Sequence, residues 1–101
     1  MIVYNITIKI LPEIEDEWVN WQKKVHIPDV MSSGRFTGYK FYRLLEQEKS
    51  DGITYVLQYS AASLEDYSRY ISEAAPGLRK KALDRWGDQF IAFRTVMQVV
   101  N

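Results

Sequence analysis

The only histidine of the sequence, His26, carries the side chain best suited to proton transfer, because imidazole changes charge near neutral pH. Trp18 and Trp21 precede it at a spacing that places both on one helix face, with Trp21 about one turn before His26. We expect His26 to exchange a proton with an enol or hydroxyl of a substrate bound in a pocket, and Trp21 to line that pocket. The alternative is a histidine that caps the helix end or bonds Asp29, with both tryptophans in the core.

Aromatic side chains make up 14% of the chain, and large rings both fill cores and line pockets. Tyr4, Tyr55 and Tyr59 have the parity of the strand residues that should face the helices. A tyrosine hydroxyl buried there needs a hydrogen-bond partner. We expect Tyr55 to line the pocket with Trp21 and His26, and core packing is the alternative for each of the three tyrosines.

Arg94 is a charged residue within an apolar strand, between Ala92 and Val96 on its own face. A charge in such a place destabilises the fold unless it is paired. By alternation we expect it to point away from the helices, toward the dimer interior with Asn5 and Gln58. Neither of these is negatively charged, so Arg94 is predicted to meet either a carboxylate from a partner copy of the chain, in a structural network, or an anionic ligand.

No motif for a cofactor, a metal ion or a covalent nucleophile is present. The sequence has no glycine-rich phosphate loop, nucleophile elbow or metal-ligand spacing, and it lacks cysteine. The basic run at 79–85 is interpreted as a solvated helix face, and the acidic run at 13–17 as a helix N-terminus. We therefore expect neither a cofactor nor a metal site.

The charge balance limits the partners that the chain can have. Its 13 basic and 13 acidic residues cancel, which argues against nucleic acid or a membrane surface as a partner. No apolar run approaches the ~20 residues that cross a bilayer. Residues 1–11 alternate and lack the charged start and apolar block of a signal peptide. A cytoplasmic location is therefore expected.

Hydrophobic periodicity places four strands and two main helices along the chain, with a third helix following the second. A helix should begin at Pro12, with an apolar stripe of Ile14, Trp18, Trp21 and Val25, and should be interrupted at Pro28. Asp51-Gly52 should form the tight turn of a hairpin. A second helix should end near Pro76, and a third should run to Gly87 with Leu78, Ala82, Leu83 and Trp86 on one face. The predicted strands cover 2–11, 36–46, 53–61 and 89–100.

This order is β-α-β-β-α-β, the ferredoxin-like arrangement of the α+β class. We expect one domain over residues 1–101 with a four-stranded antiparallel sheet. Because crossover connections are right-handed, the main helices should lie on the same face of that sheet. The length and the 47% hydrophobic content suit one domain with one core.

The sheet face away from the helices should carry few charges. A face in contact with water is normally rich in Lys and Glu, yet only two charged residues occur among those that we assign to this face on three strands. The chain has no spare element to cover it, so we expect a second copy to do so across a two-fold axis. The assigned residues are Val3, Asn5, Thr7, Lys9, Thr54, Val56, Gln58, Ser60, Phe90, Ala92, Arg94, Val96 and Gln98.

Several segments resemble an uncharacterised bacterial family of about this length. They are MIVYN at 1–5, the Trp18/Trp21 pair before His26-Ile27-Pro28, GRFTGYK at 34–40 and WGDQFIAFRT at 86–95. That family is placed among the dimeric α+β barrel proteins, whose relatives include antibiotic-biosynthesis monooxygenase-like enzymes, small isomerases and ligand-sensing domains. The resemblance implies the fold, a homodimer, and a pocket between sheet and helices that a histidine near the end of the first helix borders.

The sequence therefore predicts a homodimeric small-molecule-binding protein. If it is an enzyme, we expect cofactorless monooxygenation or isomerase-like proton transfer on an aromatic or enolisable substrate, with His26 catalytic and Trp21, Tyr55 and Arg94 binding the ligand. The alternative is a non-catalytic structural or ligand-sensing dimer, in which every aromatic side chain belongs to the core.

Overall fold

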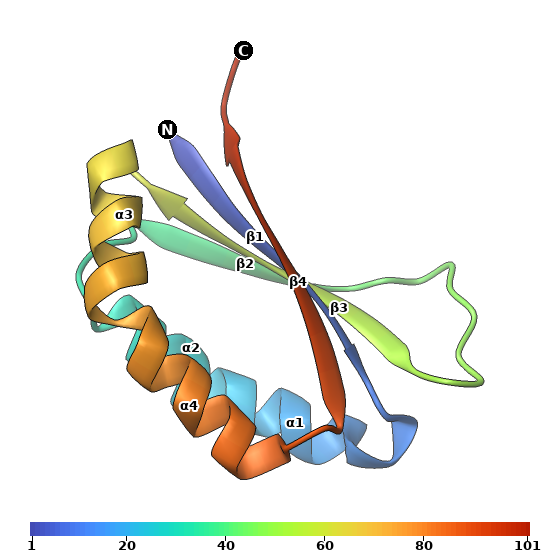
Figure 1. Cartoon of the computed structure of the whole chain (residues 1–101). Helices are drawn as coiled ribbons and strands as arrows, with labels where there is room; N and C mark the ends of the chain where they lie inside the picture. Colours follow the sequence, from blue (N-terminus) through green and yellow to red (C-terminus); the bar gives the residue numbers. More distant parts are fainter.

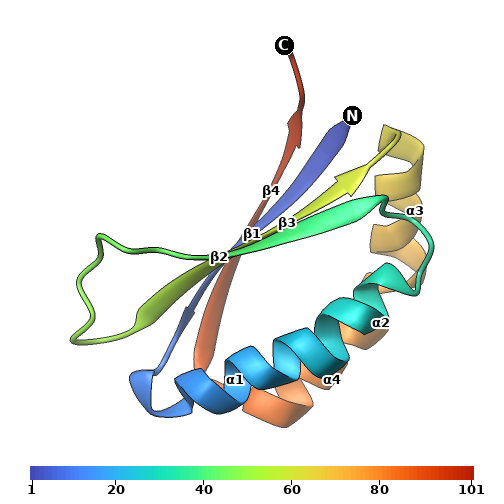
Figure 2. The same cartoon turned by 180° about the vertical axis from the view of Figure 1, so that it is seen from behind.

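A computed structural model describes residues 1–101, in which all helices cover one face of a four-stranded antiparallel sheet (Figures 1 and 2). The strand order is β2-β3-β1-β4, so the predicted ferredoxin-like fold is confirmed. The strands are β1 (Ile2–Ile10), β2 (Gly38–Arg43), β3 (Ile53–Ala61) and β4 (Phe90–Gln98). The helices are η1 (Pro12–Ile14), α1 (Glu15–Trp21), η2 (Gln22–His26), α2 (Ile27–Met31), α3 (Leu64–Glu73) and α4 (Ala75–Trp86).

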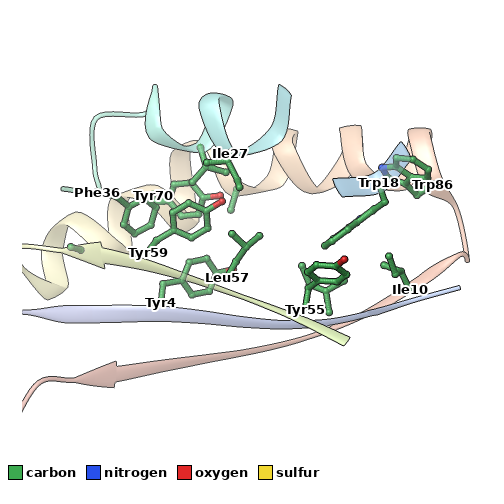
Figure 3. Close-up of a cluster of buried hydrophobic side chains, with 14 of the residues drawn as sticks. Tyr4, Ile10, Trp18, Ile27, Phe36, Tyr55, Leu57, Tyr59, Tyr70 and Trp86 are labelled. Atoms are coloured by element: carbon green, nitrogen blue, oxygen red, sulfur yellow. The ribbon is translucent and has the colours of Figure 1, made fainter. Parts of the chain in front are cut away.

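The core lies between the sheet and the helices, and it is largely aromatic (Figure 3). Alternate residues of the central strands β1 and β3 point into it, among them Tyr4, Ile8 and Leu57. One end of the core holds Tyr4, Tyr59, Tyr70 and Phe36, and the other holds Trp18, Trp86 and Tyr55. The predicted inward parity of β1 and β3 is therefore confirmed.

The predicted facing of β4 is wrong. Ile6 lies opposite Arg94 and Ile8 opposite Ala92, and residues that are directly opposite in an antiparallel pair share a face. Arg94 therefore points to the helix side, together with Phe90, Ala92, Val96 and Gln98. Both parities of this strand are rich in apolar side chains, so alternation alone does not identify its inward face.

The opposite face of the sheet is bare in Figures 1 and 2, and its β4 portion is more apolar than predicted. Ile91, Phe93, Thr95 and Met97 occupy the outward positions of β4, and Phe93 is 67% exposed. On the other three strands the charged outward residues are Lys9 and Lys40, and Lys9 pairs with Asp51 at 3.0 Å. This face thus offers a continuous surface with little charge.

The first helical segment differs from a simple helix, because a π-helical turn at η2 joins α1 to α2. The N–H of Ile27 donates to the carbonyl of Gln22, five residues back. Pro28 follows at the start of α2, so the prediction that it interrupts the helix is wrong. Proline has no backbone N–H and cannot donate the i→i−4 hydrogen bond of an α-helix. The wider π turn has room for the proline ring and does not need this hydrogen bond.

Two other sequence predictions need correction. Asp51-Gly52 does not form a tight two-residue turn, because β2 ends at Arg43 and residues 44–52 make a longer connection, in which Gln47 hydrogen bonds the backbone of Thr54. Leu83 faces solvent, with 58% of its surface exposed. Ser63 caps α3, and Gly87, with φ of +59°, ends α4 as predicted.

Candidate functional site

A cavity of about 40 Å³ lies between the sheet and the helices. Three elements contribute most of its polar or aromatic lining: the helical segment with the π turn, helix α4 and strand β4. The residues that matter for chemistry are Trp21, Gln22, His26, Trp86, Ala92 and Arg94. A water molecule needs ~10–15 Å³ of such space, so the cavity has room for a few waters or one polar group.

The π turn positions His26 in this cavity beside Gln22. In an uninterrupted α-helix with Trp18 pointing inward, the next inward residues would be near Gln22, Val25 and Asp29. One extra residue in the turn rotates the following residues by about 100°. As a result His26 lines the cavity, whereas Val25 is exposed, which corrects its place in the predicted stripe.

His26 is held as a neutral base by its surroundings. Its ring stacks on Trp21 with centroids 4.8 Å apart, and it makes no hydrogen bond to another residue of the chain. Burial lowers the pKa of His26 to about 4, and the positive charges of Arg94 and Lys81 add to this effect, whereas Asp29 opposes it. An imidazole that is neutral and unpaired at physiological pH can accept a proton from a bound hydroxyl or enol.

The structure does not show the alternative in which His26 hydrogen bonds Asp29. Asp29 pairs instead with Lys81 at 3.3 Å. His26 therefore borders the cavity without a hydrogen bond to Asp29.

Arg94 forms part of the rim. It lines the cavity from β4 while its side chain remains exposed to solvent, and it makes no ion pair with a carboxylate. An unpaired guanidinium beside a neutral imidazole favours an anionic group in the cavity mouth. Arg94 and His26 are thus brought together, although the sequence had placed Arg94 on the opposite face.

Two further cavity residues were not identified as candidates from the sequence. Gln22 Oε1 and Trp86 Nε1 are buried atoms without a hydrogen-bond partner, and both residues line the cavity. Leaving such an atom unpaired costs about 1–3 kcal/mol. The available signal for Gln22 was its position four residues after Trp18, which places an amide on the inward helix face.

Tyr55 is not in the cavity. Its hydroxyl donates to Glu15 Oε2 at 2.7 Å, and Arg43 Nε donates to the same oxygen at 2.8 Å. These two hydrogen bonds hold the pKa of the Glu15 carboxyl below its usual value, and burial together with the bond to Glu15 raises the pKa of Tyr55 to about 12. The cluster ties the first helix to β2 and β3.

We expect Tyr55→Phe to lower the free energy of unfolding by about 1–2 kcal/mol, because a hydrogen bond to a charged acceptor is lost. Urea denaturation measures this change. Tyr39→Phe is the control, since the Tyr39 hydroxyl is exposed and has no hydrogen bond within the chain. If Tyr55→Phe instead weakened ligand binding with stability unchanged, Tyr55 would belong to the site after all.

The remaining candidates from the sequence take structural places. Tyr4 and Tyr59 pack in the aromatic core, where the Tyr4 hydroxyl accepts from Arg79 at 3.1 Å. Lys80 and Arg85 are paired with Asp84 and Glu17. No group of three or more His, Asp or Glu side chains gathers in a way that could hold a metal ion. No helix combines the length and apolar character of a membrane span.

Solved structures share this fold at low sequence identity. A dimeric ferredoxin-like protein from an uncultured marine organism has a TM-score of 0.72 at 12% identity, with 99% of this chain and 95% of that chain covered. HapK from Hahella chejuensis has a TM-score of 0.74 at 11% identity, with 99% and 93% covered. SnoaB from Streptomyces nogalater, described as a cofactor-independent oxygenase, has a TM-score of 0.61 at 12% identity, with 99% and 94% covered.

Sequence comparison identifies a family. No curated protein matches the chain. Its residues 1–100 match the family described as "Domain of unknown function (DUF4286)", which confirms the expected membership in an uncharacterised family. The protein with this sheet and this cavity is a member of the DUF4286 family.

Proposed function

We propose that this protein is a homodimer that binds a small aromatic or enolisable molecule at the cavity, with His26 as the proton acceptor. The observation that carries the proposal is the neutral, unpaired imidazole of His26 in a cavity with aromatic walls and a cation at its rim. His26 takes the proton of the ligand, and the Arg94 guanidinium stabilises the anion that forms. Trp21 fixes the imidazole by stacking on it.

Two reactions follow from this deprotonation. Return of the proton to another atom of the enolate gives an isomerase. Attack of the enolate on molecular oxygen gives a cofactor-independent monooxygenase, and SnoaB, which shares the fold, is described as a cofactor-independent oxygenase. For anthrone, one oxygen atom of O₂ becomes the new carbonyl, and the other leaves as water with the two hydrogens of the substrate CH₂ group.

Oxidation of anthrone to anthraquinone, followed by absorbance, tests the monooxygenase branch. We expect His26→Ala to lower the rate by about 10²–10⁴-fold, the usual contribution of a general base. Tyr39→Phe is the control and should keep the rate of the unsubstituted protein. If folded His26→Ala protein leaves every activity and every ligand-induced shift unchanged, the enzyme proposal should be dropped.

The homodimer is supported by the bare sheet face. An ordinary interface buries about 800 Å² per partner. At ~25 cal/mol per Å² of apolar area, the free energy gained by this burial is large compared with the free energy of unfolding of a typical domain. Three of the four outward residues of β4 are apolar and the fourth is the uncharged Thr95, while two lysines are the charged outward residues on the other strands. A second copy supplies the same surface, and a two-fold axis closes the assembly.

A second candidate is a non-catalytic ligand-sensing or structural dimer. The small volume of the cavity favours it, because about 40 Å³ does not enclose an aromatic ring. A cavity that binds benzene measures ~150 Å³. Ligand-induced shifts that depend on His26, without turnover of any anthrone-type or enolisable compound, would select this candidate.

A further inference from the structure

The buried polar atoms without partners are concentrated at the cavity. Three side-chain atoms are in this state, and they are Gln22 Oε1, Tyr59 OH and Trp86 Nε1. Two of them, on Gln22 and Trp86, line the same cavity from different elements, η2 and α4. These two residues are only 3% and 2% exposed. Buried polar groups are normally hydrogen-bonded, so a donor and an acceptor without partners in one space call for a group that bonds both of them.

We propose that the cavity recognises a hydroxyl group, held between the Trp86 indole nitrogen and the Gln22 amide oxygen. The indole N–H can only donate, and the amide oxygen can only accept. A hydroxyl accepts from the first and donates to the second, so it satisfies both. An ether or a ketone oxygen would leave Gln22 unpaired, and an ammonium group would leave Trp86 unpaired.

The Trp86 donor is fixed in place before a ligand arrives. The Arg85 guanidinium lies 3.8 Å from the centroid of its ring, and the Trp21 ring meets it edge-on at 5.8 Å. Figure 3 shows Trp86 at the end of the core that also holds Trp18 and Tyr55. A donor that is held on two sides binds its acceptor with little further loss of freedom.

The size of the cavity determines which part of a ligand enters it. About 40 Å³ holds a hydroxyl or a few waters but not a ring. The ring of a hydroxylated aromatic molecule must therefore lie at the rim, where Arg94 is exposed. This inference rests on the proposed function, because it names the ligand chemistry of the same cavity.

Phenol and anisole are matched probes, since anisole keeps the acceptor oxygen and lacks the hydroxyl proton. Binding is followed by the ¹H–¹⁵N resonance of the Trp86 indole N–H. We expect phenol to bind at least about ten-fold more tightly than anisole. In Gln22→Met the difference should shrink to about three-fold or less, and in Gln98→Met, at an exposed position outside the cavity, it should persist.

The melting temperature of Gln22→Met supplies a second measurement. If Gln22 serves the ligand, replacing its unpaired amide by an apolar side chain of similar length should keep or raise the melting temperature. A clear fall would show that the amide stabilises the fold, and would overturn the proposal.

The other outcomes separate this proposal from the one on which it rests. Equal binding of phenol and anisole with shifts at the Trp86 indole would overturn the hydroxyl preference and leave the cavity as a ligand site. No shift at the Trp86 indole with either probe at millimolar concentration would overturn both proposals.

Discussion

Phe93→Glu is expected to convert the proposed homodimer into monomers. Phe93 is the most exposed large side chain on the outward face of the strands, at 67%, and it lies opposite Thr7 of the central strand β1. Burying a Phe side chain contributes about 1.5–3 kcal/mol, and a two-fold axis repeats the loss in both copies. The dissociation constant should therefore rise by at least about 100-fold, with a further rise from the buried carboxylate.

Leu83→Glu is the matched control for this experiment. Leu83 is 58% exposed, but it lies on α4 in the helix layer, on the other side of the molecule. Sedimentation equilibrium should show a dimer for Leu83→Glu and a monomer for Phe93→Glu at the same concentration. A stable folded monomer of the unsubstituted chain at low micromolar concentration would contradict the interface, as would a Phe93→Glu variant that remains dimeric.

The stability of the protein is expected to fall as the pH is lowered from about 6.5 to about 4, because of His26. In the unfolded chain His26 has its ordinary pKa of 6.5, whereas burial lowers the pKa to about 4 in the folded state. Between these values the unfolded state binds more protons, so acid favours it. We expect a loss of about 2 kcal/mol, less than the full shift implies, because the ring is partly exposed.

His26→Gln isolates this effect. Lys81 on α4 and Arg94 on β4 oppose protonation of His26, and Asp29 on α2 favours it, so the variant removes the titrating group and leaves its neighbours. Urea denaturation from pH 7 to pH 5 measures the slope of the free energy of unfolding against pH. This range lies above the pH at which the Glu15 carboxyl becomes protonated and its contribution to stability is lost. Identical slopes for His26→Gln and the unsubstituted chain would show that His26 is not buried as a neutral base.

The topology could be predicted from the sequence because local signals agreed with one another. The alternation in β1 and β3 and the Gly87 stop each matched the global arrangement. The facing of β4 could not be predicted, because apolar side chains occupy both parities of that strand. Pairing with β1 decides it, and that pairing is a long-range property.

The candidate site was predicted in part. His26 and Trp21 were chosen from residue type, and they do lie together at the cavity. Tyr55 has the correct parity but sits beyond the end of the cavity, where Glu15 binds its hydroxyl. Gln22 was missed because helix spacing indicates only that it faces inward, and the lack of a partner for its amide oxygen depends on tertiary packing.

The π turn also bears on how relatives of this chain should be compared. A relative with one residue fewer between Trp18 and Ile27 could form a continuous α-helix and keep both ends of the segment anchored. An alignment would then need a gap at this point, and a histidine in the same column as His26 would not show that the cavity chemistry is shared. Segment length between these two anchors is therefore a better guide to common function than the presence of the histidine.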